Sequence, residues 1–347
     1  MAEDNLIVYA DFDVLPREPL VSVLMITYNH ERYLAEAIEG VLAQKTDFPI
    51  ELIIGEDCST DGTRAIALDY QRRFPDHIQV ITSRHNVGGH KNYERIFYCA
   101  RGQYIAHCEG DDYWHHPLKL QMQVDSMSGD PKCVLVHTDY DRLHYPWIRR
   151  NVHCQEKPDD LAIGDCYNKV MRSYSVITAT TLYRKSIVAL YEQSIYAKQN
   201  WPFGDNQMIL FASLHGTFIY IPVSTAVWRY VSGSATNSGY RSLYSIYEKA
   251  LECRELFVSQ TGRVPPDWEE IRTEAIRSLY RLAYLAGMKT EFELHAAWLK
   301  SRGIAPGGGR HWVRRLVVAL ALPLVLVRRK AQRLSAPSSE RGYILLN

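Results

Sequence analysis

The stretch VSVLMITYNHERYLAEAIEGVLAQ, residues 21–44, decides the fold of this chain. It begins with Val21 to Thr27, a short run of apolar and β-branched side chains of the kind that builds a buried strand. A polar turn follows, and apolar residues then recur at helical spacing between Tyr33 and Ala43. The stretch therefore predicts a strand, a turn and a helix.

The same pattern recurs further along the chain. Strands are expected at residues 50–55, 78–82 and 104–108, and helices at 60–74 and 91–100. Strands that alternate with helices predict an α/β fold with a mostly parallel, doubly wound sheet. Ligands bind such sheets at the carboxyl ends of the strands, where this chain carries polar clusters at 27–31, 56–61 and 109–114.

The second half of the chain is expected to be less regular at first and then helical. A helix at 118–127 and a strand at 134–138 precede an irregular segment, 141–166. Order is expected to return over 175–183, with helices from 185 and at 207–214 and strands near 217–221 and 226–230. The predicted parts are a lead-in (1–19), an α/β domain (20–240, with halves 20–124 and 125–240), a helical accessory region (241–305) and a tail (306–347).

Composition excludes several classes of protein. The 347 residues are 46% hydrophobic and 23% charged, which is typical of a globular enzyme and not of a disordered or fibrous chain. Forty Lys and Arg against 39 Asp and Glu leave a formal charge of +1, so no nucleic-acid partner is expected. The seven cysteines are never spaced as CxxC, and no secretory signal opens the chain, so a cytoplasmic location with reduced thiols is expected.

Carboxylates gather at the predicted ligand edge of the sheet. Asp111 and Asp112 follow the strand at 104–108 directly, Glu109 precedes them, and Asp57 and Asp61 follow the strand at 50–55. Asp is also common in turns and helix caps, which is the alternative interpretation. Several carboxylates in one crevice repel one another unless a cation lies between them, and hard oxygen ligands without His or Cys suit Mg²⁺ or Mn²⁺.

Four motifs together resemble those of the family 2 glycosyltransferases with a GT-A fold. They are residues 21–44, IELIIGEDCSTDGT (50–63), NVGGHKN (86–92) and GQYIAHCEGDDYWHHPLKLQMQV (102–124). The resemblance implies a GT-A type, Rossmann-like, doubly wound mixed sheet with a C-terminal helical extension. It further implies transfer of a sugar from a nucleotide diphosphate sugar, with inversion at the anomeric carbon and with a divalent cation.

The resemblance also assigns roles to individual residues. Thr27, with Tyr28 and Asn29 after it, and Glu31 match positions beside the nucleotide. Asp57 matches the acid that reads the pyrimidine ring, Asp111 the acid that bonds the ribose, and Asp112 the metal ligand. The chain departs from the family pattern at Glu56, Cys58 and Glu109, and a side chain at position 58 requires a backbone turn that tolerates it.

Further candidates lie in two other segments. Asn86, Gly88, Lys91 and Asn92 occupy a loop and a helix start that resemble the family's loop beside base and ribose, the alternative being a simple turn. Arg229 matches a position where a cation can hold the leaving diphosphate, the alternative being a surface ion pair.

An inverting transfer needs one general base that takes the proton of the acceptor hydroxyl. The family places this carboxylate late in the domain, at the start of a helix, and Asp205 in FGDN is the matching residue. Asp205 could instead serve only as the helix cap. Gly204 stands where the family most often has another acid.

The tail combines apolar and basic residues. An apolar run, 316–327, lies between basic clusters within residues 310–333 and is too short to span a bilayer core of roughly 30 Å. The segment suits peripheral contact with the inner face of the cell membrane, the alternative being a helix packed on protein.

These features predict an inverting glycosyltransferase with Asp205 as the base and a divalent cation, Mn²⁺ or Mg²⁺, on the diphosphate. A UDP- or dTDP-linked donor and a saccharide or lipid-linked saccharide acceptor in cell-surface polysaccharide synthesis are expected. The alternative is a weakly active or inactive nucleotide-sugar-binding scaffold of the same fold. The oligomeric state is left open.

Overall fold

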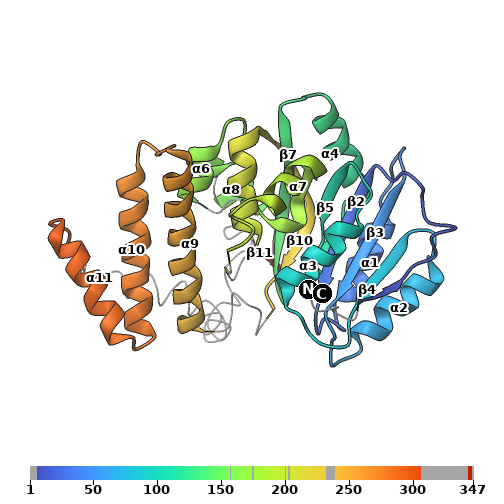
Figure 1. Cartoon of the computed structure of the whole chain (residues 1–347), viewed down its shortest axis with the longest axis horizontal. Helices are drawn as coiled ribbons and strands as arrows, with labels where there is room; N and C mark the ends of the chain where they lie inside the picture. The colour runs from blue at the N-terminus through green and yellow to red at the C-terminus, as the bar shows by residue number, and fades with distance from the viewer. Residues whose placement is uncertain are drawn as a thin grey trace, which may run out of the picture. The chain divides into compact units, whose positions relative to one another are not determined.

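The computed structural model describes residues 6–156, 158–173, 176–199, 201, 204–231, 239–305 and 343–345. The chain forms two compact units. The first comprises Met1–Val231 with Leu345–Asn347, and the second comprises Ser232–Ile344. Each unit is described by itself below (Figure 1).

The first unit begins with the predicted alternation of strands and helices. Four parallel strands run in the order β4-β3-β2-β5. Their bounds are β2 (Val21–Thr27), β3 (Ile50–Glu56), β4 (Ile78–Thr82) and β5 (Tyr104–His107). The helices between them are α1 (Leu34–Leu42), α2 (Thr63–Arg73) and α3 (Gly89–Cys99). A short strand that the sequence analysis did not predict, β1 (Ile7–Tyr9), pairs antiparallel with β4.

The second half of the sheet is mixed, as a GT-A type sheet requires. Strand β9 (Thr181–Arg184) is antiparallel to both β5 and β7 (Cys133–His144). Strand β10 (Thr217–Arg229) runs parallel to β7, and β6 (Tyr113–Trp114) pairs antiparallel with β10. The two strands predicted at 217–221 and 226–230 are thus one strand, whose pairing with β7 shifts register twice between Ile221 and Ala226.

The segment predicted to be irregular, 141–166, is more ordered than expected. Strand β7 continues to His144, turns and pairs with β8 (Trp147–Arg149). Helix α5 (Val152–Glu156), the 3₁₀ turn η1 (Pro158–Asp160) and α6 (Tyr167–Arg172) follow. Asp139 and Asp141, both fully buried on β7, accept hydrogen bonds from this segment, and such long-range partners leave no periodicity in the sequence.

Four further elements belong to the first unit. They are α4 (Lys119–Ser128), the 3₁₀ turn η2 (Thr178–Thr180), α7 (Lys185–Gln193) and α8 (Asp205–His215). One core cluster joins α1, α2 and α4 to one face of the sheet through residues such as Val23, Ile38 and Leu120. Helix α3 lies on the other face, where a Cβ atom added at Gly55 would meet Asn92 at 2.8 Å and Ile96 at 2.9 Å.

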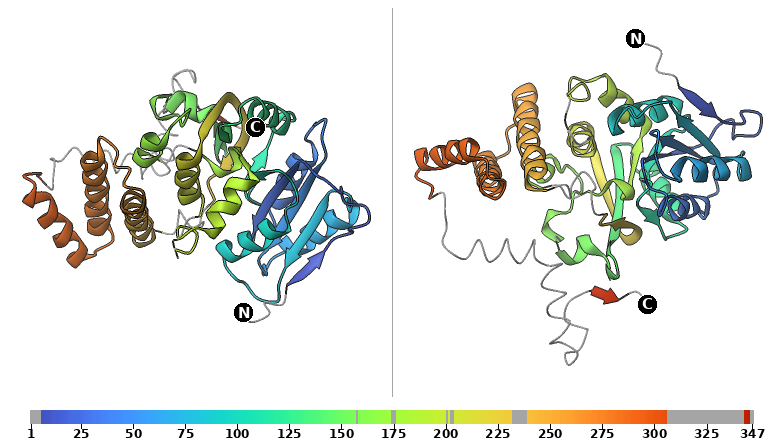
Figure 2. Two further views of the ribbon diagram at one scale, coloured as in Figure 1. Left: turned by 45° about the horizontal axis from the view of Figure 1, so that its top comes forward. Right: turned by 90° about the horizontal axis from the view of Figure 1, so that it is seen from below.

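The second unit contains three consecutive helices that pack side by side (Figure 2). They are α9 (Tyr240–Thr261), α10 (Trp268–Leu285) and α11 (Lys289–Ser301), and a strand, β11 (Tyr343–Leu345), lies near the end of the chain. A small core that includes Leu279, Ala283 and Leu299 holds the helices together. Among the described residues, no helix is both long enough and apolar enough to span a bilayer. The segment proposed for membrane contact, 310–333, lies outside the described residues.

Candidate active site

The predicted site residues converge at the carboxyl ends of the parallel strands. Thr27 ends β2 and is 2% exposed, and Asp57 follows β3 directly. The backbone N–H of Gly110, just after β5, donates to the carbonyl of Ile26 at 3.0 Å. A Cβ atom at Gly110 would lie 2.6 Å from Oγ1 of Thr27, so only glycine allows this close approach of the acidic segment to β2.

The loop after β2 is tied to the loop after β3. The backbone N–H of Asn29 donates to Ser59 Oγ at 3.0 Å, and Asn29 Oδ1 accepts from the N–H of Thr60 at 2.9 Å. Glu31 accepts the N–H of Gly62 at 2.8 Å, at the start of α2. Tyr28, the residue before Asn29, is 42% exposed. Asn29 and Glu31 therefore both brace the two loops, whereas Tyr28 presents its ring to solvent.

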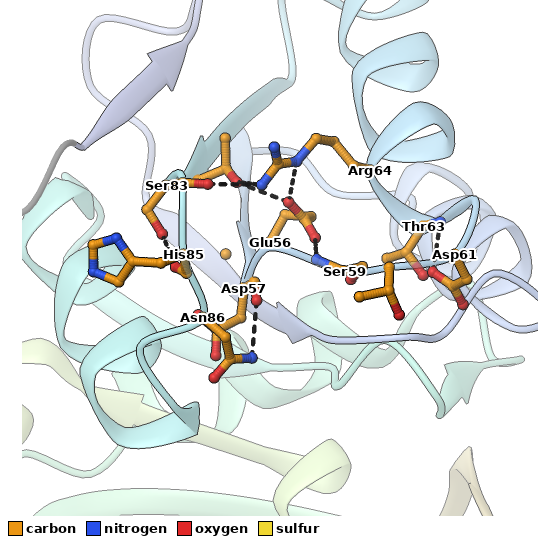
Figure 3. Close-up of polar contacts among 12 residues, drawn as sticks. Glu56, Asp57, Ser59, Asp61, Thr63, Arg64, Ser83, His85 and Asn86 are labelled. Carbon is orange, nitrogen blue, oxygen red and sulfur yellow. Dashed lines mark hydrogen bonds and ion pairs between the residues drawn. The ribbon is translucent and has the colours of Figure 1, made fainter.

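Asp57 anchors the loop that follows β4. Its Oδ1 accepts the N–H of Val87 at 2.8 Å, its Oδ2 accepts the N–H of Gly88 at 2.9 Å, and its carbonyl accepts from the side chain of Asn86 at 2.9 Å (Figure 3). Gly88 has φ +86°, a conformation that favours glycine. Asp57 and Asn86 are thus brought together, and the Asp57 carboxylate shapes the loop that carries Gly88.

The two departures from the family pattern beside Asp57 have distinct structural consequences. Glu56 is fully buried, and burial opposes its ionisation, but hydrogen bonds from Ser59, Arg64 and Thr82 outweigh this and lower its pKa. These bonds measure 2.6 Å from Ser59 N, 2.6 Å from Arg64 Nε and 2.7 Å from Thr82 Oγ1 (Figure 3). Cys58 has φ +58°, so a side chain here occupies the left-handed conformation that glycine adopts without strain.

The other two residues predicted from this loop lie on α3 and differ in exposure. Asn92 is 1% exposed, and its Nδ2 donates to the carbonyl of Gly55 at 2.7 Å. Its side chain therefore fastens α3 to β3 inside the protein. Lys91, the residue before it, is exposed.

The acidic segment after β5 carries closely spaced negative groups. Burial raises the pKa of Asp112 well above its ordinary value, Asp111 adds to this, and Arg229 opposes it. Burial likewise raises the pKa of Glu109, with further contributions from Asp112, Asp111 and Asp205. Since repulsion and burial disfavour the charged forms, a bound cation would relieve both effects.

Arg229, at the end of β10, holds this acidic segment in place through hydrogen bonds. Its backbone N–H donates to Asp112 Oδ1 and its Nη1 to the carbonyl of Asp111, both at 2.9 Å. Its Nη2 bonds Glu36, and the guanidinium lies 4.4 Å from the ring centre of Tyr113. Arg229 is buried at 8% exposure while its ion-pair partner Glu36 is 56% exposed, so the ion pair considered from the sequence is present, with only its acidic partner at the surface.

Asp205 is the first residue of α8, which begins two residues before the helix predicted at 207–214. Its Oδ2 accepts the hydroxyl of Thr178 at 3.0 Å, and its Oδ1 accepts the N–H of Asn206 at 2.8 Å. The carboxylate is partly exposed and contributes to the raised pKa of Glu109. Asp205 thus lies within electrostatic reach of the acidic segment.

The carboxylates at this edge suit a cation that is held by the protein and a bound ligand together. Within the described residues, no three His, Cys, Asp or Glu side chains are arranged to hold a metal ion. Asp112 nevertheless is a buried carboxylate whose negative charge is incompletely offset, beside Asp111. Oxygen ligands of this kind fit Mg²⁺ or Mn²⁺, which usually keep several ligands from water or substrate phosphates.

Sequence reasoning missed two site residues. His30 places Nδ1 3.2 Å from Thr27 Oγ1 and Nε2 3.9 Å from Asp111 Oδ2, so it bridges β2 to the acidic segment. Its place three residues after Thr27, in TYNH, was the available signal. Thr178 binds Asp205 from a segment without a motif, and no sequence signal could have found it.

Comparisons with known proteins agree with this geometry. Residues 22–188 match the sequence model of the family described as Glycosyl transferase family 2. An uncharacterized protein of Mycobacterium tuberculosis is 45% identical over 112 residues, 32% of this chain and 32% of that protein. The putative glycosyltransferase EpsE of Bacillus subtilis is 42% identical over 106 residues, 30% of this chain and 37% of EpsE. The chain spans about a third of the length of these curated relatives.

Two solved structures share the fold. The mannosyltransferase PcManGT of Pyrobaculum calidifontis, in complex with GDP-Man and Mn²⁺, aligns over 92% of this chain and 85% of its own, with a TM-score of 0.55 and 17% identity. TarS of S. aureus, residues 1–349 in complex with UDP-GlcNAc, aligns over 81% and 87%, with a TM-score of 0.51 and 17% identity. Residues 22–188, just under half of the chain, therefore match glycosyl transferase family 2, and the chain has the GT-A fold.

Proposed function

We propose that this chain is an inverting glycosyltransferase that moves a sugar from a nucleotide diphosphate sugar to a hydroxyl group of a saccharide or lipid-linked saccharide. The observation that carries the proposal is the convergence of Thr27, Asp57, Asp111 and Asp112 at one sheet edge, with Asp205 within electrostatic reach of it. The donor-bound complexes of PcManGT and TarS support a nucleotide-sugar donor.

The donor would lie against the loops that follow β2, β3 and β4. The Asp57-braced loop, with Asn86, Gly88 and Lys91, would face the base and ribose, and Asp111 would accept a ribose hydroxyl. Each carboxylate oxygen of Asp57 accepts one backbone N–H of the loop and keeps a further lone pair. Asp57 would contact the base through these lone pairs. A pyrimidine base, in a UDP- or dTDP-linked sugar, is the proposed match to this arrangement.

Asp112, with Asp111 beside it, would hold the divalent cation, Mn²⁺ or Mg²⁺. When bound, this cation would supply positive charge to the diphosphate. Arg229 would hold Asp112 and Asp111 in place through its bonds to both residues, and its own charge would add to the positive field there. Its guanidinium is engaged with Glu36, so Arg229 acts on the diphosphate through the acidic segment.

Asp205 would act as the general base. As the acceptor oxygen forms its bond to the anomeric carbon, its proton passes to the Asp205 carboxylate, and the bond pair of the departing oxygen leaves with the nucleoside diphosphate. Attack from the side opposite the leaving group inverts the configuration.

The parts of the chain would divide the work between them. Residues 20–124 would bind the donor, 125–240 the acceptor, and 241–305 would form an accessory region, with 310–333 contacting the inner face of the membrane. The name of a further relative supports a cell-surface polysaccharide: the putative teichuronic acid biosynthesis glycosyltransferase TuaG of Bacillus subtilis, 34% identical over 126 residues, 36% of this chain and 48% of TuaG.

The proposal is tested by titrating the purified protein with UDP-, dTDP-, GDP- and CMP-linked sugars, with Mn²⁺ and with a chelator. Thermal stabilisation and release of nucleoside diphosphate are the readouts. Metal-dependent stabilisation by UDP or dTDP sugars with turnover would support the proposal. Binding without turnover in the presence of saccharide acceptors would favour a nucleotide-sugar-binding scaffold, and no response would contradict both.

A further inference from the structure

A series of buried and part-buried hydrogen bonds connects the proposed base, Asp205, to α3, the helix that follows the loop carrying Gly88. Thr178 Oγ1 donates to Asp205 Oδ2 at 3.0 Å, and the carbonyl of Thr178 accepts from Thr181 Oγ1 at 2.8 Å. Nδ1 of His107 lies 3.1 Å from Thr181 Oγ1, and Nε2 of His107 lies 3.1 Å from the hydroxyl of Tyr93 on α3. Five residues from four segments thus form one connected series.

The directions of these bonds follow from counting hydrogens. A threonine hydroxyl has one hydrogen, and that of Thr181 is donated to the Thr178 carbonyl. His107 must therefore donate its own hydrogen from Nδ1 to Thr181, which leaves Nε2 as the acceptor of the Tyr93 hydroxyl. Burial lowers the pKa of His107 to about 3, which keeps the ring neutral, and burial raises the pKa of Tyr93, which keeps its hydrogen in place.

His107 is enclosed by the elements that it links. Its side chain is 4% exposed, and its ring stacks on Tyr93 with centres 5.6 Å apart and meets the edge of Tyr183 at 5.5 Å. Tyr93 follows Asn92, whose backbone N–H donates to the carbonyl of Gly88 in the first turn of α3 and whose side chain donates to the carbonyl of Gly55. His107 therefore supports both the loop that carries Gly88 and the proposed base, Asp205, through its hydrogen-bonded neighbours.

We propose that His107 and Thr178 are positioning residues that hold the Asp205 carboxylate at a fixed place relative to the loop that carries Gly88. The series is not a path for protons, because Thr178 joins its two halves through covalent bonds between its carbonyl and its hydroxyl. Its effect is orientation: Thr178 fixes Oδ2 of Asp205, and His107 fixes Thr178 through Thr181. This inference rests on the proposed role of Asp205 as the base.

Thr178 gives the sharpest test, because valine removes the hydroxyl at nearly the same volume and serine keeps it. With UDP-GlcNAc or GDP-Man and Mn²⁺, we expect T178V to lower kcat about ten- to hundredfold while the donor KM stays within about twofold. T178S should recover most of the lost kcat. A kcat of T178V near that of the unaltered protein, a T178S variant as slow as T178V, or a donor KM that changes as much as kcat would each overturn the inference.

His107 supplies a matched second pair. Asparagine places an N–H near the position of Nδ1 and can still donate to Thr181, whereas leucine cannot. We expect H107N to retain more kcat than H107L, with similar donor KM values. Loss of the Thr178 bond should matter less once His107 is gone, so T178V should lower kcat less in the H107L background than alone. Full additivity of the two losses would contradict a shared function.

The ring hydrogen of His107 can be observed without any turnover. In protein labelled with ¹⁵N-histidine, the His107 resonances, identified by their absence from the H107N spectrum, should show the hydrogen on Nδ1. A hydrogen on Nε2 would overturn the inference whether or not the protein is active. If the unaltered protein turns over no sugar of the UDP-, dTDP-, GDP- and CMP-linked panel, the proposed function fails. Activity with a kcat that does not change in the Thr178 and His107 variants rejects the positioning role alone.

Discussion

The backbone N–H of Arg229 donates to the carboxylate of Asp112 at 2.9 Å, so the last residue of β10 holds the proposed metal ligand that follows β5. The two residues lie 117 positions apart in the sequence. The Arg229 side chain also bonds the carbonyl of Asp111 and the carboxylate of Glu36. Arg229 thus holds the acidic segment through the carboxylate of Asp112 and through the backbone carbonyl of Asp111.

Replacing Arg229 by methionine should separate the contact made by its backbone N–H from the contacts made by its side chain. Methionine keeps the backbone N–H that holds Asp112 but removes the bond to Asp111 and the cation over Tyr113. We expect a loss of about 1–3 kcal/mol in the free energy of unfolding, because the part-buried carbonyl of Asp111 loses its charged donor, together with weaker binding of the nucleotide sugar. Urea unfolding and donor titration measure these two effects.

Glu36→Gln is the control for this change. The Glu36 side chain is 56% exposed, so water can solvate it when the ion pair is lost, and the expected cost is about 0–1 kcal/mol. If R229M and E36Q lost the same stability, the ion pair would account for the effect and the bond to Asp111 would not.

Asp205→Asn should remove the proposed base while leaving the fold and donor binding in place. An amide still accepts the Thr178 hydroxyl but cannot take a proton from the acceptor. We expect kcat to fall about 10²–10⁴-fold with a similar donor affinity. Asp69→Asn, an exposed change on α2, is the matched control and should leave kcat unaltered. A D205N variant with near-normal kcat would require another base.

Asp57→Asn tests the anchor of the loop after β4. The amide can accept one of the two backbone N–H groups, from Val87 and Gly88, and turns an N–H toward the other. We expect about 1–3 kcal/mol lower stability, faster hydrogen exchange at Val87 and Gly88, and weaker donor binding. Weaker donor binding with unchanged exchange at both amides would show that Asp57 contacts the nucleotide without shaping the loop.

Cys58→Gly should stabilise the protein, because Cys58 has φ +58°. The left-handed conformation costs a residue other than glycine about 1–2 kcal/mol. Glycine also has more conformational freedom in the unfolded chain, which offsets part of the gain from relieving this strain, so we expect the free energy of unfolding to rise by about 0.5–1 kcal/mol. Cys58→Ala keeps the strain and should not gain. Equal stabilities of the glycine and alanine variants in urea would contradict the strain.

The strands at 21–27, 50–56 and 78–82 and the carboxylates that follow them could be predicted because apolar runs and motifs are local in sequence. The role of Arg229 could not, since a backbone N–H that binds Asp112 carries no side-chain signature. Asp139 likewise interrupted the apolar pattern of β7. Three of its partners, the N–H groups of His153 and Cys154 and the hydroxyl of Tyr220, come from distant segments. Burial opposes the ionisation of Asp139, but the hydrogen bonds from Cys154, His153 and Tyr140 outweigh it and lower the pKa of Asp139.

Lys119, the first residue of α4, is fully buried and should make stability depend on pH. Its Nζ donates to Gln123 at 2.7 Å and lies 4.2 Å from the ring centre of Trp114. Burial lowers the pKa of Lys119 from 10.5 to about 7. Between these values the folded lysine is neutral while the unfolded one is protonated, so unfolding binds a proton and stability rises with pH.

Lys119→Met removes this titration and fills a similar volume. Below pH 7 both states of the unaltered protein carry the charge, and the desolvation cost is fully present, so K119M should be the more stable protein there. From pH 7 to about 10 the unaltered protein should gain on the variant. Urea unfolding of both proteins across this range gives the difference at each pH. A difference that stays constant from pH 6 to 10 would mean that Lys119 titrates alike in both states, contrary to its burial.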